Sequence, residues 1–278
     1  MFIILDIIKP PEKLRRRRRT IKEINSSAPE VHRTSGGLPF YTARICEDKG
    51  AVNWDAVNRK CSRYASKIIV PRTVYIPDTC NLLRFVPKHF GSTLVFNTAI
   101  NLLKSAAISP QSLALTLSDR SGILNGRLHE LLEYSSVIKI ITLHPERYAS
   151  ACCKAYEEYG ASVILRSSHE QTAKPELIIA ADGCFSPLMH KSAVIAGKSF
   201  SAGALKIICS GIDLSKEHAA LLPDGIQAYD FAGALTELCF CRDYINSSFS
   251  QTTIQGEYSA CESAAQALRR YTADTSFT

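Results

Sequence analysis

The sequence predicts an α/β fold made of two domains. Short apolar runs of strand length alternate with amphipathic stretches of roughly 10–15 residues, a pattern typical of a mostly parallel sheet with helices on both faces. The chain of 278 residues is long enough for two domains of ordinary size. Its hydrophobic content of 46% and charged content of 21% are those of a globular protein, which excludes a disordered or collagen-like chain. We expect an N-terminal α/β domain over residues 1–108 and a second domain over residues 109–278.

The first hundred residues predict short strands and three helices. The apolar run 2–8 predicts a strand that ends at a Lys-Pro-Pro sequence, and the prolines favour a helix start, so we expect a helix over residues 11–25. Residues 26–39 are rich in Ser, Pro and Gly and predict a long loop, which in a compact domain usually has a function or is mobile. Periodicity predicts strands at 41–46, 67–70 and 74–76 and helices at 53–65 and 93–106.

The second domain is predicted from a more regular alternation. Apolar runs predict strands at 113–117, 137–143, 162–165, 177–181, 193–196 and 205–209. Amphipathic stretches predict helices at 123–134, 145–159, 229–240 and 260–271.

Positive charge is concentrated in one short segment. The chain carries 33 basic and 26 acidic residues, a formal net charge of +7. Residues 9–22 hold eight basic groups and one acid, so this segment alone accounts for +7, and the remaining 25 basic and 25 acidic residues cancel. A neutral body with one basic helix argues against a protein that binds nucleic acid over a broad surface.

The ten cysteines and the N-terminus indicate a reducing environment. The apolar start of the chain is short, contains Asp6 and has its positive charges after it, which does not fit a secretory signal peptide. Nowhere do about 18 or more apolar residues run together, so no membrane-spanning helix is expected. We expect a cytoplasmic location and reduced, mostly buried cysteines. The pairs Cys152-Cys153 and Cys239-x-Cys241 lack a second pair at zinc-finger spacing, so no metal site is expected.

Three segments resemble one group of enzymes. They read FNTAINLLKSAAISPQSLALTLSDRSG from residue 96, IITLHPERY from residue 140 and PELIIAADG from residue 175. Their order is similar to that of amino-acid dehydrogenase-type Rossmann domains, the group of the shikimate and methylene-tetrahydrofolate dehydrogenases. The resemblance covers residues 90–185 and implies a Rossmann-like second domain, with a nicotinamide dinucleotide at the ends of its first strands.

The sequence departs from this group at both of its functional centres. A dinucleotide-binding turn needs glycines so that the backbone approaches the pyrophosphate. Here the turn reads Ser118-Asp119-Arg120-Ser121-Gly122, with one glycine and a carboxylate where the phosphate belongs. Asn97-Thr98 is followed by Ala99 where such enzymes carry an aspartate, and the N-terminal half has no match to their catalytic lysine motif.

Other residues at the predicted strand ends are candidates for cofactor binding. Thr142, His144 and Arg147 follow the second strand, where an arginine in place of an acid favours the 2′-phosphate of NADP, if a dinucleotide binds. Asp182 and Gly183 follow a later strand at the edge where open α/β sheets hold ligands, although Asp-Gly is also a favoured turn pair.

The basic helix and the loop after it are candidates for binding an anion. Leu14, Ile21 and Ile24 define an apolar stripe on which Arg17 or Arg18 falls. That arginine either lays its stem on the core and pairs with a carboxylate, or binds a ligand phosphate or carboxylate. Ser35, Gly36 and Gly37 form the best glycine-containing anion cradle of the chain, unless they are only a connection.

Common catalytic motifs do not account for the sequence. Gly197-Lys198-Ser199 lacks the first glycine of a phosphate-binding P-loop, because residue 192 is serine. Cys184 as a nucleophile would need a histidine base near it in space. Neither a G-x-S-x-G elbow nor an H-E-x-x-H pair is present.

Three functions are consistent with these observations. The first is a Rossmann-like protein without clear catalytic residues that binds a small anionic metabolite or nucleotide in an interdomain cleft. The second is a divergent NAD(P)-dependent oxidoreductase, and the third is an adaptor that docks to an acidic partner through the basic helix. The sequence assigns neither a substrate nor an oligomeric state.

Overall fold

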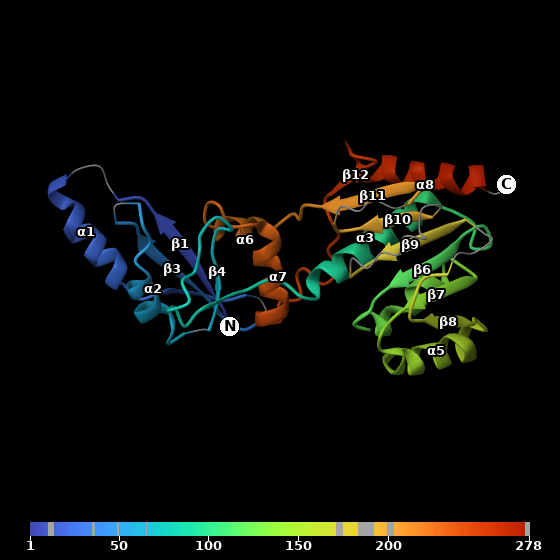
Figure 1. Ribbon diagram of the computed structural model, residues 1–278, viewed down its shortest axis with the longest axis horizontal. Coiled ribbons are helices and arrows are strands. Elements are labelled where there is room, and N and C mark those ends of the chain that lie inside the picture. Colours follow the sequence, from blue (N-terminus) through green and yellow to red (C-terminus); the bar gives the residue numbers. More distant parts are fainter. Residues whose placement is uncertain are drawn as a thin grey trace. The chain divides into compact units, whose positions relative to one another are not determined.

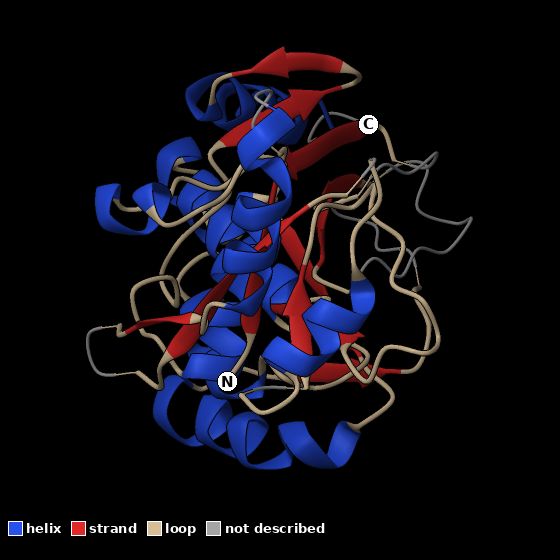
Figure 2. Ribbon diagram, turned by 90° about the vertical axis from the view of Figure 1, so that its left-hand side faces the viewer, coloured by secondary structure: helices blue, strands red, loops and turns tan. Residues whose placement is uncertain are grey.

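The computed structural model describes residues 1–10, 14–34, 37–48, 50–64, 66–170, 175–182, 192–198 and 203–275, and of residues 14–18 and 275 the backbone only (Figure 1). It confirms the α/β class, with helices and mostly parallel strands along the whole chain (Figure 2). The chain forms two compact units: unit 1 consists of residues 1–88 and 214–245, and unit 2 of residues 89–213 and 246–278. These bounds differ from the expected division at residue 108, since α3 (Phe90–Ala106) packs on unit 2 and residues 214–245 return to unit 1.

Unit 1 is built on a five-stranded sheet in the order β2-β3-β1-β4-β5. Its centre is β1 (Ile3–Ile8), which pairs in parallel with β3 (Phe40–Cys46) and with β4 (Lys67–Ile69). The antiparallel β2 (Glu30–His32), within the predicted loop, and the short β5 (Leu83–Arg84) form the edges. The apolar run at the N-terminus is thus the buried middle of a sheet, as expected for a parallel strand covered on both faces.

Two helices from the later part of the chain complete unit 1. They are α6 (Lys216–Ala220) and α7 (Ala228–Cys239). Phe231 of α7 meets the rings of Phe2 and Phe40 edge-on, at centroid distances of 6.3 and 5.5 Å. All three rings are fully buried, so α7 belongs to the core of unit 1.

The basic helix is α1 (Leu14–Ser26), and its C-terminal end is held by a buried lysine. Lys60 of α2 (Trp54–Cys61) donates hydrogen bonds to the carbonyls of Ile24 and Arg44, at 2.9 and 2.8 Å, and to the hydroxyl of Ser27. Burial lowers the pKa of Lys60, although a nearby cysteine opposes this shift. One cation therefore ties the C-terminal end of α1 to β3.

The predicted strand at 74–76 is wrong. These residues form no strand, and the edge strand of the sheet is β5 instead. The guanidinium of Arg84 donates to the carbonyls of Val70, Pro71 and Val74, so a side chain takes the place of a strand partner. Prolines at 71 and 77 also restrict the backbone at both ends of this segment.

Unit 2 contains a sheet of eight described strands in the order β13-β12-β11-β10-β9-β6-β7-β8. The strands β6 (Ala114–Ser118), β7 (Val137–Ile141), β8 (Val163–Arg166), β9 (Glu176–Ala180), β10 (Ala193–Ala196) and β11 (Leu205–Ser210) are parallel. Numbered from β6, their order is 3-2-1-4-5-6, which is that of doubly wound nucleotide-binding sheets. The antiparallel hairpin of β12 (Gln251–Ile254) and β13 (Glu257–Ser259) extends this sheet.

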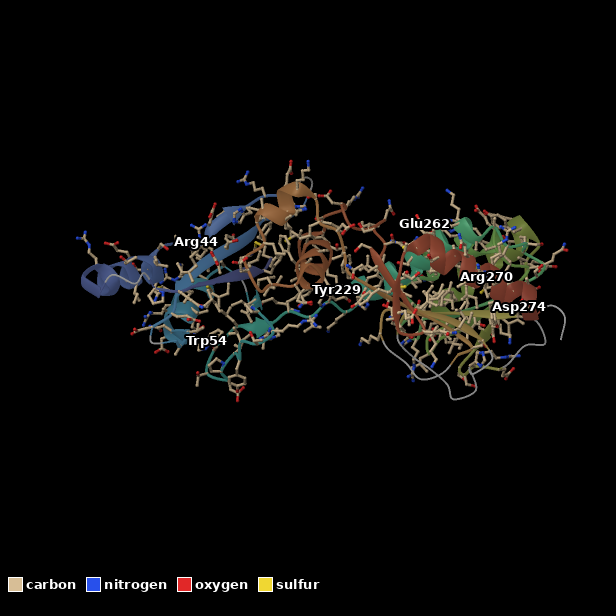
Figure 3. All side chains as sticks on the ribbon, turned by 90° about the horizontal axis from the view of Figure 1, so that it is seen from above. Arg44, Trp54, Tyr229, Glu262, Arg270 and Asp274 are labelled. Carbon is tan, nitrogen blue, oxygen red and sulfur yellow. The ribbon has the colours of Figure 1, made fainter. Side chains whose placement is uncertain are left out.

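Helices cover the sheet of unit 2. Helix α3 and helix α8 (Cys261–Thr275) lie side by side against β9–β12, and α5 (Pro145–Tyr159) lies against β8 (Figure 1). Helix α8 is amphipathic: Ala264 and Leu268 are buried, whereas Glu262, Arg270 and Asp274 face outward (Figure 3).

The predicted helix at 123–134 is wrong in its extent. The segment contains a 3₁₀ turn, η1 (Asn125–Arg127), and the short α4 (His129–Leu132). A side-chain carboxylate binds backbone N–H groups at the start of this segment, as described below, and this competes with a regular helix.

Candidate functional site

The topology singles out one edge of the sheet in unit 2 as the place for a ligand. Strands β6 and β9 are neighbours from which the chain winds in opposite directions, and ligands of open α/β sheets bind outside the carboxyl ends of such strands. Ser118 at the end of β6 pairs in register with Ala180 at the end of β9. The turns after these strands begin with Asp119 and Ala181, so two of the sequence-predicted site segments meet here.

The carboxylate of Asp119 is fully buried in the turn after β6. Its Oδ1 accepts hydrogen bonds from the backbone N–H of Gly122 and the hydroxyl of Ser121, both at 3.0 Å. Its Oδ2 accepts from the backbone N–H of Leu124, at 2.8 Å, and from the hydroxyl of Tyr148, at 2.7 Å. Four donors therefore surround an anion that the protein itself supplies.

A second carboxylate, that of Asp182, occupies the neighbouring position after β9. Its Oδ1 accepts from the hydroxyl of Ser118, at 2.9 Å, and its Oδ2 accepts from the backbone N–H of Arg120. The backbone N–H groups of residues 120, 122 and 124 thus all donate to carboxylates of the chain. A bound pyrophosphate would need such groups.

Gly122 is needed here for packing and for its backbone conformation. Its φ is +69°, in the left-handed region that favours glycine. A Cβ atom at this position would lie 2.9 Å from Cδ of Arg147, so the turn approaches the start of α5 closely. The glycine that the sequence interpretation assigned to a phosphate thus has a structural use.

The residues predicted to contact the cofactor ribose are bonded to neighbouring parts of the chain. Oγ1 of Thr142 accepts from the backbone N–H of His144, and Nδ1 of His144 lies 3.1 Å from Glu146. Nη1 of Arg147 donates to the carbonyl of Ser121, at 2.7 Å, and ties α5 to the turn after β6.

Asn97 and Thr98, from the segment that resembles a substrate motif, also make contacts within unit 2. The amide oxygen of Asn97 accepts from Arg127, and its Nδ2 donates to the carbonyl of Ser247. Oγ1 of Thr98 accepts from the backbone N–H of Phe249, at 2.9 Å. These two residues hold α3 against residues 247–249.

Several predicted residues lie outside the described part of the structure. They are the side chains of Arg17 and Arg18, and the residues Ser35, Gly36 and Gly183. Gly37 is described: its N–H donates to the carbonyl of Thr34, and a Cβ atom there would lie 2.7 Å from the carbonyl oxygen of Cys239.

The sequence interpretation missed a pocket between η1, α4 and α5. Its volume is about 420 Å³, within the range of small-molecule sites. Leu128, Leu132, Ala151 and Ala155 provide its apolar lining, and the cationic side chains that line it are Arg147 and Lys154. The signal in the sequence was the run of small residues on one face of α5, at 150, 151 and 155.

No protein-family model matches the chain, and no curated protein matches it significantly. Within the described residues, every helix is too short or too polar to cross a membrane.

Proposed function

We propose that this protein is a non-catalytic binding protein for a small organic anion, and that it does not bind a dinucleotide at the turn after β6. The observation that carries this proposal is the buried carboxylate of Asp119, which accepts hydrogen bonds from the backbone N–H groups of Gly122 and Leu124. Cytoplasmic location is part of the proposal and is supported by nine free cysteines among the described residues.

The argument against a dinucleotide is one of occupancy and charge. A pyrophosphate binds to such a turn through free backbone N–H groups and the start of a helix. Here Asp119 and Asp182 take those groups, and two carboxylates would repel a phosphate. The helix that would present its N-terminus is also reduced to η1 and α4.

The argument for an organic anion rests on the pocket between η1, α4 and α5. Arg147 and Lys154 both line it, whereas Glu158 is the one acidic residue among its described lining residues. The apolar residues beneath them suit a hydrophobic body attached to a carboxylate or a phosphate. A ligand of this kind would fill apolar space and pair its charge with Lys154, which is exposed.

The strand order gives the oxidoreductase hypothesis its only specific support. The order 3-2-1-4-5-6 is shared with dinucleotide-binding sheets. Many functions occur on that fold, so the function has to be inferred from the residues of the site. Binding of NAD or NADP therefore serves as the competing outcome in the experiment.

The test is a thermal-shift measurement on the full chain with phenyl phosphate, benzoate, benzyl alcohol, NAD and NADP. We expect the two aromatic anions to raise the melting temperature and the neutral alcohol to have no effect. A ligand at 100 times its Kd stabilises the folded state by about 2.7 kcal/mol. A shift with NAD or NADP and none with the aromatic anions would support the oxidoreductase and overturn the proposal.

Two variants locate the site. Lys154→Ala removes the charge, and Ala151→Leu fills the pocket; both should abolish the shift caused by phenyl phosphate. Lys104→Ala, an exposed lysine at the end of α3, is the matched control and should leave the shift unchanged. A shift that survives both pocket variants would mean that the anion binds elsewhere.

A further inference from the structure

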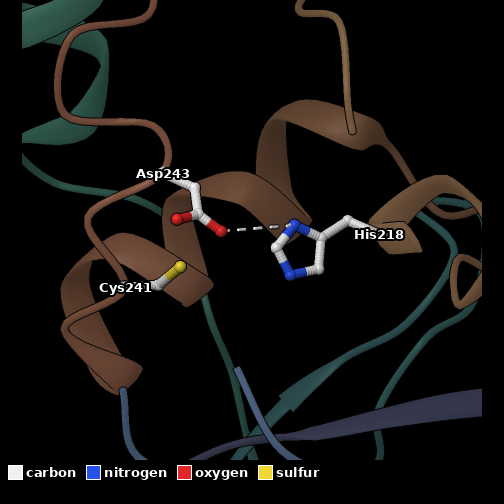
Figure 4. A group of neighbouring side chains, drawn as sticks. All are labelled: His218, Cys241 and Asp243. Carbon is white, nitrogen blue, oxygen red and sulfur yellow. Dashed lines mark ion pairs between the residues drawn. The ribbon is translucent and has the colours of Figure 1, made fainter. Parts of the chain in front are cut away.

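Three side chains that can bind a metal ion come together in unit 1. His218, Cys241 and Asp243 each place one potential ligand atom within 4.8 Å of the other two (Figure 4). His218 comes from α6, and the other two residues follow α7. Sequence spacing did not reveal this cluster, because a histidine 23 positions before the cysteine has no zinc-finger spacing.

The structure assigns a divalent metal site to His218, Cys241 and Asp243, and their chemistry favours Zn²⁺. Imidazole nitrogen, thiolate sulfur and carboxylate oxygen are the three ligand types that zinc uses in proteins. Around a tetrahedral ion such atoms lie about 3.3–3.8 Å apart, so the distances between the ligand atoms would have to shorten by about 1 Å when an ion binds. Asp243 can move in this way, because its side chain is 44% exposed and lies 4.0 Å from Nδ1 of His218.

The histidine is already fixed in place. Ser215 caps α6 by accepting from the backbone N–H of His218, at 3.2 Å, and the imidazole ring is buried. The hydroxyl of Tyr244 lies 2.8 Å from Nδ1 of His218. Tyr244 thus holds the ring with Nδ1 on the side of Asp243.

A buried hydroxyl next to the cluster supports the assignment. Thr34 is 8% exposed, and its hydroxyl lies next to the thiol of Cys241. A Cβ atom at Gly37 would lie 2.4 Å from this oxygen and 3.5 Å from the backbone nitrogen of Cys241, so the hydroxyl is beside the cysteine. A hydroxyl in this position can donate to the thiolate that would bind the ion.

The expected site has three protein ligands and one solvent ligand. Zinc sites with three protein ligands keep a fourth position for water, and the exposure of Asp243 leaves this position open to solvent. The ion would also connect α6 to the segment after α7, close to the end of that helix, where the backbone N–H of Leu38 donates to the carbonyl of Cys239, at 2.7 Å. Removal of the ion should therefore lower the melting temperature of the chain.

The test is a titration of the reduced, chelator-treated full chain with Co²⁺, followed by displacement with Zn²⁺. A thiolate bound to Co²⁺ gives a charge-transfer band in the near ultraviolet. We expect this band in the wild type and its loss on addition of Zn²⁺. No band at millimolar Co²⁺ would overturn the proposal.

The variants separate this site from adventitious binding to other thiols. Cys241→Ala should lose the band, whereas Cys239→Ala, which alters an equally buried cysteine two positions away, should keep it. Asp243→Asn changes an exposed side chain and should weaken Co²⁺ binding by at least about tenfold without loss of the fold. A band that persists in Cys241→Ala, or an affinity unchanged in Asp243→Asn, would contradict the assignment.

Discussion

The hydroxyl of Tyr148 donates a 2.7 Å hydrogen bond to Oδ2 of Asp119, and neither residue is exposed to solvent. The two residues lie 29 positions apart, on α5 and on the turn after β6. Burial raises the pKa of Tyr148, and the charge of Asp119 raises it further, so the phenol remains a donor at all physiological pH values. The turn is thus held by a charge-assisted hydrogen bond in the interior of unit 2.

Tyr148→Phe should destabilise the protein measurably. The substitution keeps the ring but leaves Asp119 with three of its four donors. A hydrogen bond to a buried charged group contributes about 1.5–3 kcal/mol, and we expect a loss of this size in urea unfolding. Tyr156→Phe, on the exposed face of the same helix, should change stability by less than about 0.5 kcal/mol. Equal stability of the two variants would show that Asp119 does not depend on Tyr148.

A second buried carboxylate predicts how stability responds to acid. Glu176 at the start of β9 accepts from Thr116, from Nε2 of His169, at 2.9 Å, and from Ser192, at 3.1 Å. Burial alone would raise the pKa of Glu176, but the hydrogen bonds from His169 and Thr116 outweigh it, and the net effect is a lowered pKa. The network lies at the beginning of the strand, at the edge of the sheet opposite the turn after β6.

The lowered pKa of Glu176 fixes the sign of the pH dependence. Its contribution to stability is fully present above the pKa of an unfolded glutamate, about 4.3, and is lost as the pH falls through the lower pKa of the folded state. Urea unfolding measured between about pH 3 and pH 7, at intervals of about half a pH unit, follows this loss. Glu176→Gln should be less stable at neutral pH by about 1–3 kcal/mol and should lose less stability in acid. If the free energy of unfolding fell with acid as steeply in Glu176→Gln as in the wild type, the acid sensitivity would belong to other groups.

The α/β alternation could be predicted from the sequence because the buried strands are continuous apolar runs. Strands β6, β9 and β10 are buried along their whole length, and the predicted ranges agree with them to within one residue at every end. The hairpin of β12 and β13 was missed because its strands are polar. Its signal was Gln255-Gly256, where two residues of positive φ make the tight turn.

The division into units and the contacts of the sites could not be predicted from local patterns. The burial of Phe231 against Phe2 and Phe40 joins α7 to residues that lie 229 and 191 positions earlier in the chain, and local periodicity cannot predict contacts between such distant segments. The sequence did show that Asp119 is unusual in a nucleotide-binding turn. It did not show Tyr148 as its partner, since that contact depends on how α5 lies against the turn.

The return of residues 214–245 to unit 1 leads to a prediction that the tryptophan fluorescence can test. The chain has one tryptophan, Trp54, which lies on α2 in unit 1, so its emission reports on that unit. Phe231→Ala removes a fully buried ring from the contact with Phe2 and Phe40 and should cost about 3–5 kcal/mol. We expect the urea midpoint followed at Trp54 to fall accordingly. Phe240→Ala, an exposed phenylalanine just after the same helix, is the control and should leave the midpoint nearly unchanged. If both variants unfold at the wild-type midpoint, α7 is not part of the core of unit 1, because a cavity of that size in a packed interior always lowers stability.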